Sequence, residues 1–152
     1  MHDPLSGLAV FERGWLSSNN VLVHAAPGEP GALLIDTSHV NHAAQTLALV
    51  QHELAGRALA GLANTHLHSD HCGGNALLQR AFGVPLAMPP GMADAVRNWD
   101  EDRLSYRATG QRMDAFDWQS LLVPGQALVA GGREWEVLAT AGHDPHMVML
   151  FD

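Results

Sequence analysis

The sequence predicts a mixed α/β fold (α+β class) in a single domain spanning residues 1–152. Three observations lead to this prediction. Short apolar runs bounded by Gly, Pro, Asn and Ser recur along the chain, as strands do. Between them lie segments whose apolar residues return every three or four positions, as in helices that cover a sheet. The composition is 47% hydrophobic and 16% charged, which suits one soluble domain with a buried core.

The first part of the chain predicts a meander of three strands. The apolar segments 8–12, 20–26 and 32–36 are separated by the polar residues 17–20 and by the breaker 27–31, which holds two prolines and two glycines. Strands joined by such short turns pair with their neighbours in sequence. We therefore expect the fold to open with adjacent strands of one sheet.

A helix is predicted over residues 41–55. Asn41 is a suitable N-cap, apolar residues return at i, i+4, i+7 and i+11 from Ala43, and Gly56 follows the last of them. The apolar segment 57–63 then predicts a buried strand. The order strand, helix, strand indicates a βαβ-type step.

The remaining elements alternate in a similar way. Helices are predicted at 75–82 and 91–99, with a short strand at 84–88 between them. Strands at 127–130 and 134–140 form a predicted hairpin across Gly131-Gly132-Arg133, and a last apolar strand covers 147–151. Each predicted strand end is a place where functional residues can gather.

Residues that bind metals are concentrated directly after the strand at 57–63. Within six residues the chain holds His66, His68, Asp70 and His71. In an extended segment His66 and His68 point to the same side and can hold one ion, whereas a helical turn after them would bring Asp70 and His71 to a second ion. Neutral imidazole and carboxylate suit Zn²⁺ best, with Fe or Mn as alternatives, because no cluster of cysteines is present.

Three motifs, in order, resemble one known family. His66-Leu67-His68-Ser69-Asp70-His71 resembles the signature of the metallo-β-lactamase-fold hydrolases, and its flanking residues are most similar to the glyoxalase II and lactonase-like branch. Leu33-Leu34-Ile35-Asp36-Thr37 resembles the first motif, a strand that ends in a supporting aspartate. Thr140-Ala141-Gly142-His143-Asp144-Pro145 resembles the third, Thr-Pro-Gly-His-Ser/Thr-Pro. The resemblance runs from about Asn20 to the C-terminus.

The resemblance implies a four-layer αββα sandwich and hydrolysis of an ester, thioester or lactone-type small molecule by water activated on one or two Zn²⁺ ions. The implied ligands are His66, His68 and His143 for the first ion and Asp70 and His71 for the second. Asp70 would also be the catalytic residue that orients the attacking water. Asp36 would position the loop without binding metal.

One departure from the family pattern is large. The family continues with an aspartate that bridges the two metals, commonly in a Gly-Asp pair, and later with a further histidine. Only residues 144–152 follow His143, and neither feature is found in them. We therefore expect the chain to be C-terminally incomplete, the N-terminal half of the sandwich, with a weak second metal site. Without the second sheet, the inner face of the first sheet would be bare, which predicts self-association or packing on a missing C-terminal half.

Residues 99–119 are the least family-like part of the chain and are interpreted as an insertion near the active site. In one interpretation Arg103, Arg107 and Arg112 bind an acidic substrate together with Tyr106. In the other, the segment is a solvated helical excursion whose apolar residues pack on the domain.

The composition also excludes some classes of partner. The net charge is −8, and the eight basic residues are arginines without a run that could follow a phosphate backbone, so no nucleic acid is expected. Residues 1–7 lack the pattern of a secretory leader and no apolar run is long enough to span a bilayer, which predicts a cytoplasmic protein without membrane association. The single cysteine, Cys72, is expected to serve packing.

Two other functions stay open at this stage. Some members of the resembling superfamily hold iron and oxidise sulfur compounds, in the manner of persulfide dioxygenases. The oxygen-reducing flavo-di-iron branch typically has glutamate at the position of His68, which argues against that version. The third alternative is an inactive metal-binding half-domain. His146 has two interpretations, a substrate-side group or, more commonly for a lone histidine, a loop residue without a role in the site.

Overall fold

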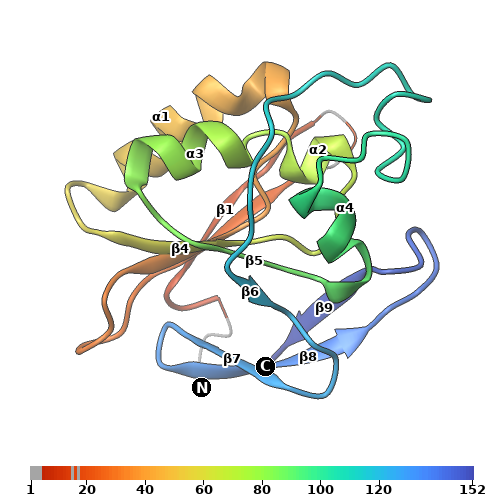
Figure 1. Cartoon of the computed structure of the whole chain (residues 1–152). Helices are drawn as coiled ribbons and strands as arrows, with labels where there is room; N and C mark the ends of the chain where they lie inside the picture. The colour runs from red at the N-terminus through yellow and green to blue at the C-terminus, as the bar shows by residue number, and fades with distance from the viewer. Residues whose placement is uncertain (1–4, 15, 17) are drawn as a thin grey trace.

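The structure is a computed structural model that describes residues 5–14, 16 and 18–152; part of the predicted turn at 17–20 and of the N-terminal segment 1–7 lies outside them. Its strands form two sheets that lie face to face (Figure 1). The larger sheet contains β1 (Leu8–Phe11), β2 (Asn20–Val23), β3 (Ala32–Ile35), β4 (Leu59–Ala63), β5 (Leu86–Met88) and β6 (Ser120–Leu121). The smaller sheet contains β7 (Ala127–Ala130), β8 (Arg133–Ala139) and β9 (Val148–Phe151).

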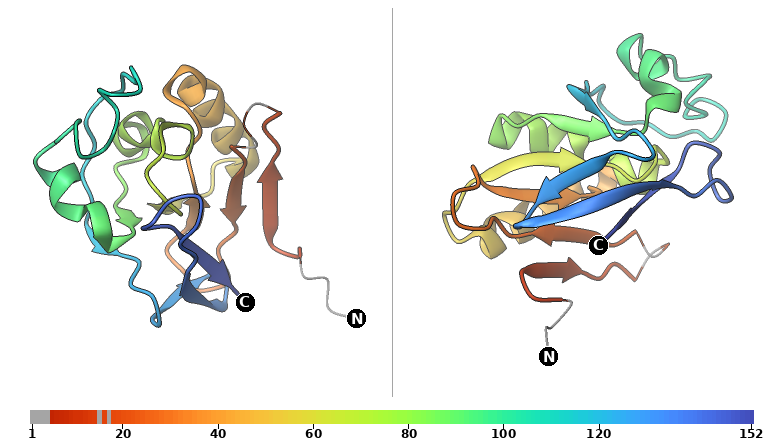
Figure 2. Two further views of the ribbon diagram at one scale, coloured as in Figure 1. Left: turned by 90° about the vertical axis from the view of Figure 1, so that its right-hand side faces the viewer. Right: turned by 90° about the horizontal axis from the view of Figure 1, so that it is seen from below.

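The helices lie on the side of the larger sheet that faces away from the smaller one (Figures 1 and 2). They are α1 (Ala43–Leu54), α2 (Ser69–Cys72), α3 (Asn75–Phe82) and α4 (Ala93–Arg97), with the 3₁₀ turns η1 (Val40–His42) and η2 (Pro90–Met92). In the described part of the chain, no helix combines the length and apolarity needed to cross a membrane. The layers are therefore helix, sheet, sheet, as expected for part of an αββα sandwich.

The strand pairing in the larger sheet changes from antiparallel to parallel at β3. Strands β1, β2 and β3 form the predicted antiparallel meander, and β3, β4, β5 and β6 run parallel to one another in the order of the chain. The step from β3 through α1 to β4 confirms the predicted βαβ unit. Because the carboxyl ends of parallel strands meet at one edge of a sheet, the residues after β3 and after β4 become neighbours.

Alternation along β3 separates the two cores of the molecule. Leu34 is fully buried on the helix side, where it belongs to one cluster with Val50 of α1 and Leu78 of α3. Leu33 and Ile35 point to the opposite side and pack against residues of the smaller sheet. Burying both faces of one strand in this way is typical of a parallel sheet between two layers.

The expectation that the chain contains no second sheet is wrong, because three strands of that sheet, β7, β8 and β9, are present. Val23 and Ala63 of the larger sheet pack with Trp135, Val137 and Val148 of the smaller one, so the inner face of the first sheet is partly covered (Figure 2). Sequence reasoning treated the hairpin and the last strand as part of the first half and therefore underestimated the second sheet. The outer face of the smaller sheet still exposes apolar side chains: Val129, Met149 and Phe151.

Several element ends differ from the sequence prediction for local reasons. The helix predicted from Asn41 begins with η1, because the ring of His39 accepts the backbone N–H of Asn41 and His39 is the N-cap of this turn. The strand predicted at 57–63 begins at Leu59, because the Arg57 guanidinium donates to the last carbonyls of α1. Residues 101–110 form turns, so the interpretation of this segment as a helical excursion is wrong about the helix. It is right that the apolar residues pack on the domain, since Leu104, Tyr106 and Phe116 belong to the core.

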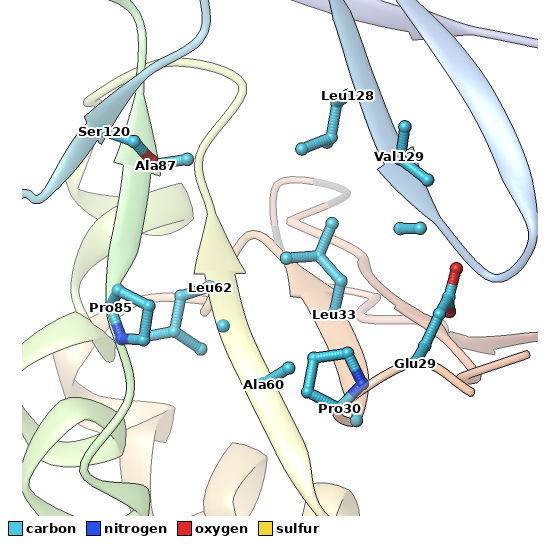
Figure 3. A pocket seen from close by; sticks show the side chains of 13 residues that line it. Glu29, Pro30, Leu33, Ala60, Leu62, Pro85, Ala87, Ser120, Leu128 and Val129 are labelled. Carbon is cyan, nitrogen blue, oxygen red and sulfur yellow. The ribbon is translucent and has the colours of Figure 1, made fainter.

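The carboxylate of Glu29 joins the two sheets at the end opposite the residues predicted to bind metal. It accepts the backbone N–H groups of Ala26, Gly131 and Gly132 at 2.8–2.9 Å. The two glycines have positive φ and form the two-residue turn of the predicted hairpin between β7 and β8. A cavity of about 340 Å³ lies beside Glu29, lined from the larger sheet by Leu33 and from the smaller by Leu128 (Figure 3). Glu29 thus connects the loop before β3 to the turn between β7 and β8 by hydrogen bonds.

Replacement of Glu29 by glutamine is expected to lower the midpoint of thermal unfolding, and more at pH 7 than at pH 3. Hydrogen bonds from Ala26, Gly132 and Gly131 lower the pKa of Glu29 below its ordinary value of 4.5. A lowered pKa stabilises the fold above pH 4.5, and this contribution is lost as the pH falls through the folded-state pKa. Equal destabilisation at both pH values would contradict a role for the charge.

Candidate metal centre

The candidate ligands come from loops at the ends of strands in both sheets. His66 and His68 follow β4, and His143 lies in the loop between β8 and β9. The backbone of His68 is extended (φ −65°, ψ 146°) and the residue is the N-cap of α2, so the chain turns helical only after the second histidine. The two loops are tied together because the N–H of Val148 donates to the carbonyl of Thr65 at 2.9 Å.

Three imidazoles converge at this point. One ligand nitrogen from each of His66, His68 and His143 lies within 4.8 Å of the others. Nδ1 of His68 is 2.9 Å from Nε2 of His143, and the ring of His66 packs edge-on against both. Three nitrogens so placed are the donor set of a tetrahedral or open metal site.

Of the three histidines, His66 has the environment most typical of a metal-binding residue. The residue is 3% exposed, and its Nε2 has no hydrogen-bond partner within the described residues. Its Nδ1 lies 3.0 Å from the hydroxyl of Thr65, which itself donates to Asp36 and is therefore free to accept. The hydrogen-bond network thus assigns the proton of His66 to Nδ1 and leaves the lone pair of Nε2 directed away from Thr65. A buried, unpaired nitrogen is costly unless something binds it.

The protonation state of His66 suits metal binding as well. Burial, followed by the charges of neighbouring histidines, lowers the pKa of His66 to about 4. Its imidazole is therefore neutral at pH 7, which is the form that binds metal ions. An orphaned buried nitrogen, a fixed tautomer and two further imidazoles together fit a resident metal ion.

Asp70 and His71 form a second pair beside this cluster. Nε2 of His71 is 3.5 Å from the carboxylate of Asp70, and the rings of His66 and His71 have centroids 4.1 Å apart. Burial lowers the pKa of His71, but the hydrogen bond to Asp36 and the charges of Asp36 and Asp70 outweigh it, and the net pKa is raised. The structure brings Asp70 and His71 together beside the three-histidine cluster, and their role in a second metal site stays a prediction.

Asp36 supports both groups from behind. Its carboxylate accepts the N–H and the hydroxyl of Thr65 and lies 2.8 Å from Nδ1 of His71. Through Thr65 it fixes the proton of His66, and directly it fixes the proton of His71, in both rings on Nδ1. Nε2 of His66 is thus left without a partner among the described residues, whereas Nε2 of His71 faces Asp70. The residue has a φ of 58°, a left-handed conformation that aspartate tolerates better than most residues.

A sequence model of the Metallo-beta-lactamase superfamily matches residues 13–152. The chain belongs to this superfamily. The match takes in all three motifs and most of the described chain. Among curated proteins no sequence match is found.

Solved structures of metallo-beta-lactamases share the fold of this superfamily member. The native FEZ-1 enzyme from Legionella gormanii superposes with a TM-score of 0.72 at 16% identity, covering 87% of this chain and 50% of its own. The metallo-beta-lactamase with the HARLDQ motif from Cronobacter sakazakii has a TM-score of 0.75 at 21% identity, covering 97% of this chain and 57% of its own. BJP-1 from Bradyrhizobium japonicum has a TM-score of 0.66 at 19% identity, covering 86% of this chain and 48% of its own.

The present chain spans about half the length of these enzymes. This agrees with the predicted half-sandwich, although the observed half includes three strands of the second sheet. The neighbours are metallo-beta-lactamases, so the predicted likeness to the glyoxalase II branch stays a prediction.

Two glycines in the metallo-beta-lactamase motif allow close packing rather than an unusual turn. Gly73 and Gly74 have φ of −62° and −87°, values that any residue adopts. A Cβ on Gly73 would overlap the backbone nitrogen of Val40, and one on Gly74 would overlap the carbonyl oxygen of Thr37. The two glycines are therefore needed for close packing and not for their backbone conformation. They allow the loop that carries the candidate ligands, residues 64–74 and here named the metal loop, to pack against the segment that follows β3.

Three polar residues that sequence reasoning did not single out brace the same loop. The hydroxyl of Thr37 donates to the side-chain oxygen of Asn75, whose amide donates to the side-chain oxygen of Asn64 at 2.6 Å. Asn64 in turn donates to the carbonyl of His71 at 3.2 Å. All three are fully buried. Their positions within the first motif, for Thr37, and close to the second, for Asn64 and Asn75, were the available signal.

Residues 104–111 lie against the metal loop. The hydroxyl of Tyr106 donates to the carbonyl of Leu67 at 2.9 Å and is only 3% exposed, and burial raises its pKa. Tyr106 therefore packs beneath the loop, and the expectation that it contacts an acidic substrate is wrong. Arg107 pairs with Glu101 and Asp102 instead of standing free.

Cys72 also lies beneath the loop, as predicted for a packing residue. It is fully buried, and its thiol contacts the carbonyls of Leu67 and His68 and the hydroxyl of Tyr106. Burial, the largest effect, raises the pKa of the thiol to about 12. At pH 7 the thiol is protonated, so it is unsuited to metal binding in this position.

Proposed function

We propose that this chain carries the metal-binding part of a Zn²⁺-dependent hydrolase that acts on a small ester, thioester or lactone-type molecule. One observation carries the proposal: Nε2 of His66 is buried without a hydrogen-bond partner beside the ligand nitrogens of His68 and His143. Membership of the superfamily supports a metal-dependent hydrolase. The choice of zinc rests on a donor set of neutral imidazoles without thiolates.

The residues of the chain would divide the work as follows. His66, His68 and His143 would hold the first ion, and Asp70 with His71 would begin a second position. When bound, Zn²⁺ lowers the pKa of a coordinated water from 15.7 to about 7 and polarises the bond under attack. We assign the orientation of the attacking water to Asp70, whose side chain is 16% exposed. Asp36 and Thr65 would keep the proton of each buried imidazole on the nitrogen that does not face the ion.

The partner that suits this site is a small molecule. The net charge of −8, without a run of basic residues, disfavours a nucleic acid. We retain the cytoplasm as the proposed compartment, on the sequence reasoning alone. We also propose self-association, or packing on a further part of the fold; the apolar face left to cover is the outer face of the smaller sheet, where Val129 is 67% and Phe151 57% exposed.

Two alternative functions are each supported by a specific observation. Three histidines also suit iron, so an iron-dependent sulfur-oxidising enzyme of the same fold is the second candidate. An inactive metal-binding half-domain is the third, because this chain spans about half the length of the solved enzymes and Asp70 and His71 supply only two ligands of a second site.

Elemental analysis combined with hydrolysis and oxygen-uptake assays tests these functions. The purified chain and a longer form that includes the second half are loaded with zinc or iron. They are then compared for hydrolysis of thioesters, lactones and simple esters, and for oxygen uptake with persulfides. We expect about one tightly bound zinc per chain and weak hydrolysis, with faster hydrolysis by the longer form. Oxygen uptake dependent on iron, with no hydrolysis, would contradict the proposal. A longer form that binds zinc and turns over no substrate would favour the inactive half-domain.

A further inference from the structure

Asp144 departs from the superfamily pattern at a position that touches the candidate metal centre. The third motif has Ser or Thr after its histidine, and this chain has an aspartate. One oxygen of Asp144, Oδ2, lies 3.4 Å from Nε2 of His68, and the Asp144 side chain is 14% exposed. This separation is within ion-pair range but longer than the roughly 2.7–3.2 Å of a protein N–H···O hydrogen bond.

The loop that carries His143 also fixes the carboxylate of Asp144. The backbone N–H of His146 donates to Oδ1 at 2.7 Å, which leaves Oδ2 for His68. The N–H of Thr140 donates to the carbonyl of Met147 at 3.0 Å and closes the loop at its base. Asp144 is therefore oriented by its own backbone segment and does not depend on His68 for its position.

The two nitrogens of His68 face different groups. Nδ1 lies 2.9 Å from Nε2 of His143, inside the cluster, and Nε2 faces Asp144 on the outside. Asp36 stands in the same relation to His71, on the nitrogen that faces away from Asp70. Carboxylates that accept the outer N–H of a metal-binding histidine fix its tautomer and raise its basicity.

We propose that Asp144 is a positioning residue that holds the proton of His68 on Nε2 and so presents Nδ1 to the metal ion. This inference rests on the proposed metal site. A serine at the same position carries no charge and ends one bond closer to the backbone, so it would leave Nε2 of His68 to solvent. Partners of this kind commonly change metal affinity by 10–100-fold.

The test measures zinc affinity and the protonation of His68 in the same proteins. Asp144→Ser restores a residue type of the family pattern, Asp144→Asn removes the charge at nearly constant size, and Asp94→Asn is the matched control on the exposed surface of α4. Affinity is measured by competition with a chromophoric chelator. The tautomer of His68 is read from ¹⁵N resonances of the ring, with and without zinc.

We expect Asp144→Ser and Asp144→Asn to bind zinc about 10–100-fold more weakly than the parent chain, while Asp94→Asn is unchanged. The Nε2–H signature of His68 should be present in the parent chain and lost or mixed in Asp144→Ser, also without metal. Parent-like affinity and tautomer in both Asp144 variants would overturn the inference, provided that His68→Ala loses zinc. A parent chain that binds no zinc, or a His68→Ala variant that keeps it, would instead overturn the proposed metal site.

Discussion

Replacement of His68 by alanine is expected to weaken zinc binding by at least about 100-fold, because removal of a direct ligand should cost no less than the largest losses seen for supporting residues. His68 is the suitable position, because its side chain is 43% exposed and its loss leaves little empty space in the core. Nδ1 of this residue lies 2.9 Å from Nε2 of His143, so the variant also removes the nearest neighbour of that ligand. Zinc content after dialysis and competition with a chelator measure the effect.

The matched control for His68→Ala is His52→Ala, which removes an exposed histidine on α1, outside the site. It should bind zinc as the parent chain does. If His68→Ala retained parent zinc content, the ion would be held elsewhere and the three-histidine cluster would not be the site. Equal losses in both variants would point to an indirect effect on the fold.

The loop with the candidate ligands could be predicted from the sequence because these residues are close together in the chain. His66, His68, Asp70 and His71 stand within six residues directly after a buried strand, and the parallel pairing of β3 with β4 brings Asp36 to them. Strand periodicity and the rule that functional residues gather at the carboxyl ends of parallel strands were enough for this part.

The features that sequence reasoning missed depend on contacts between distant segments. Tyr106 reaches beneath the metal loop from a stretch of turns, so neither its burial nor its partner Leu67 can be read from spacing. The role of Gly73 depends on how closely the segment after β3 approaches, and the second sheet depends on packing of Trp135 and Val137 against β2 and β4. The periodicity of a strand predicts which of its faces is apolar. It does not predict which other element covers that face, because this depends on tertiary packing.

Replacement of Asp36 by alanine is expected to destabilise the fold by about 3–5 kcal/mol, the range found when one partner of a buried, charged hydrogen-bonded pair is removed. Asp36 is 5% exposed and accepts two groups of Thr65, with Nδ1 of His71 at 2.8 Å. Alanine would leave these donors unpaired and would also have to adopt a φ of 58°. Urea unfolding of the metal-free chain measures the loss.

Two comparisons separate the role of the Asp36 carboxylate from a general loss of charge. Asp114→Ala removes an exposed carboxylate paired with Arg80 and should cost at most about 1 kcal/mol. Asp36→Asn keeps the left-handed backbone and one acceptor, and it removes the charge that raises the pKa of His71. A raised histidine pKa stabilises the fold below its ordinary value of 6.5, and that contribution disappears as the pH rises through the folded-state pKa. The difference in unfolding free energy between the parent chain and Asp36→Asn should therefore be larger at pH 6 than at pH 8. If Asp36→Ala were as stable as Asp114→Ala, Asp36 would not be the group that organises the site.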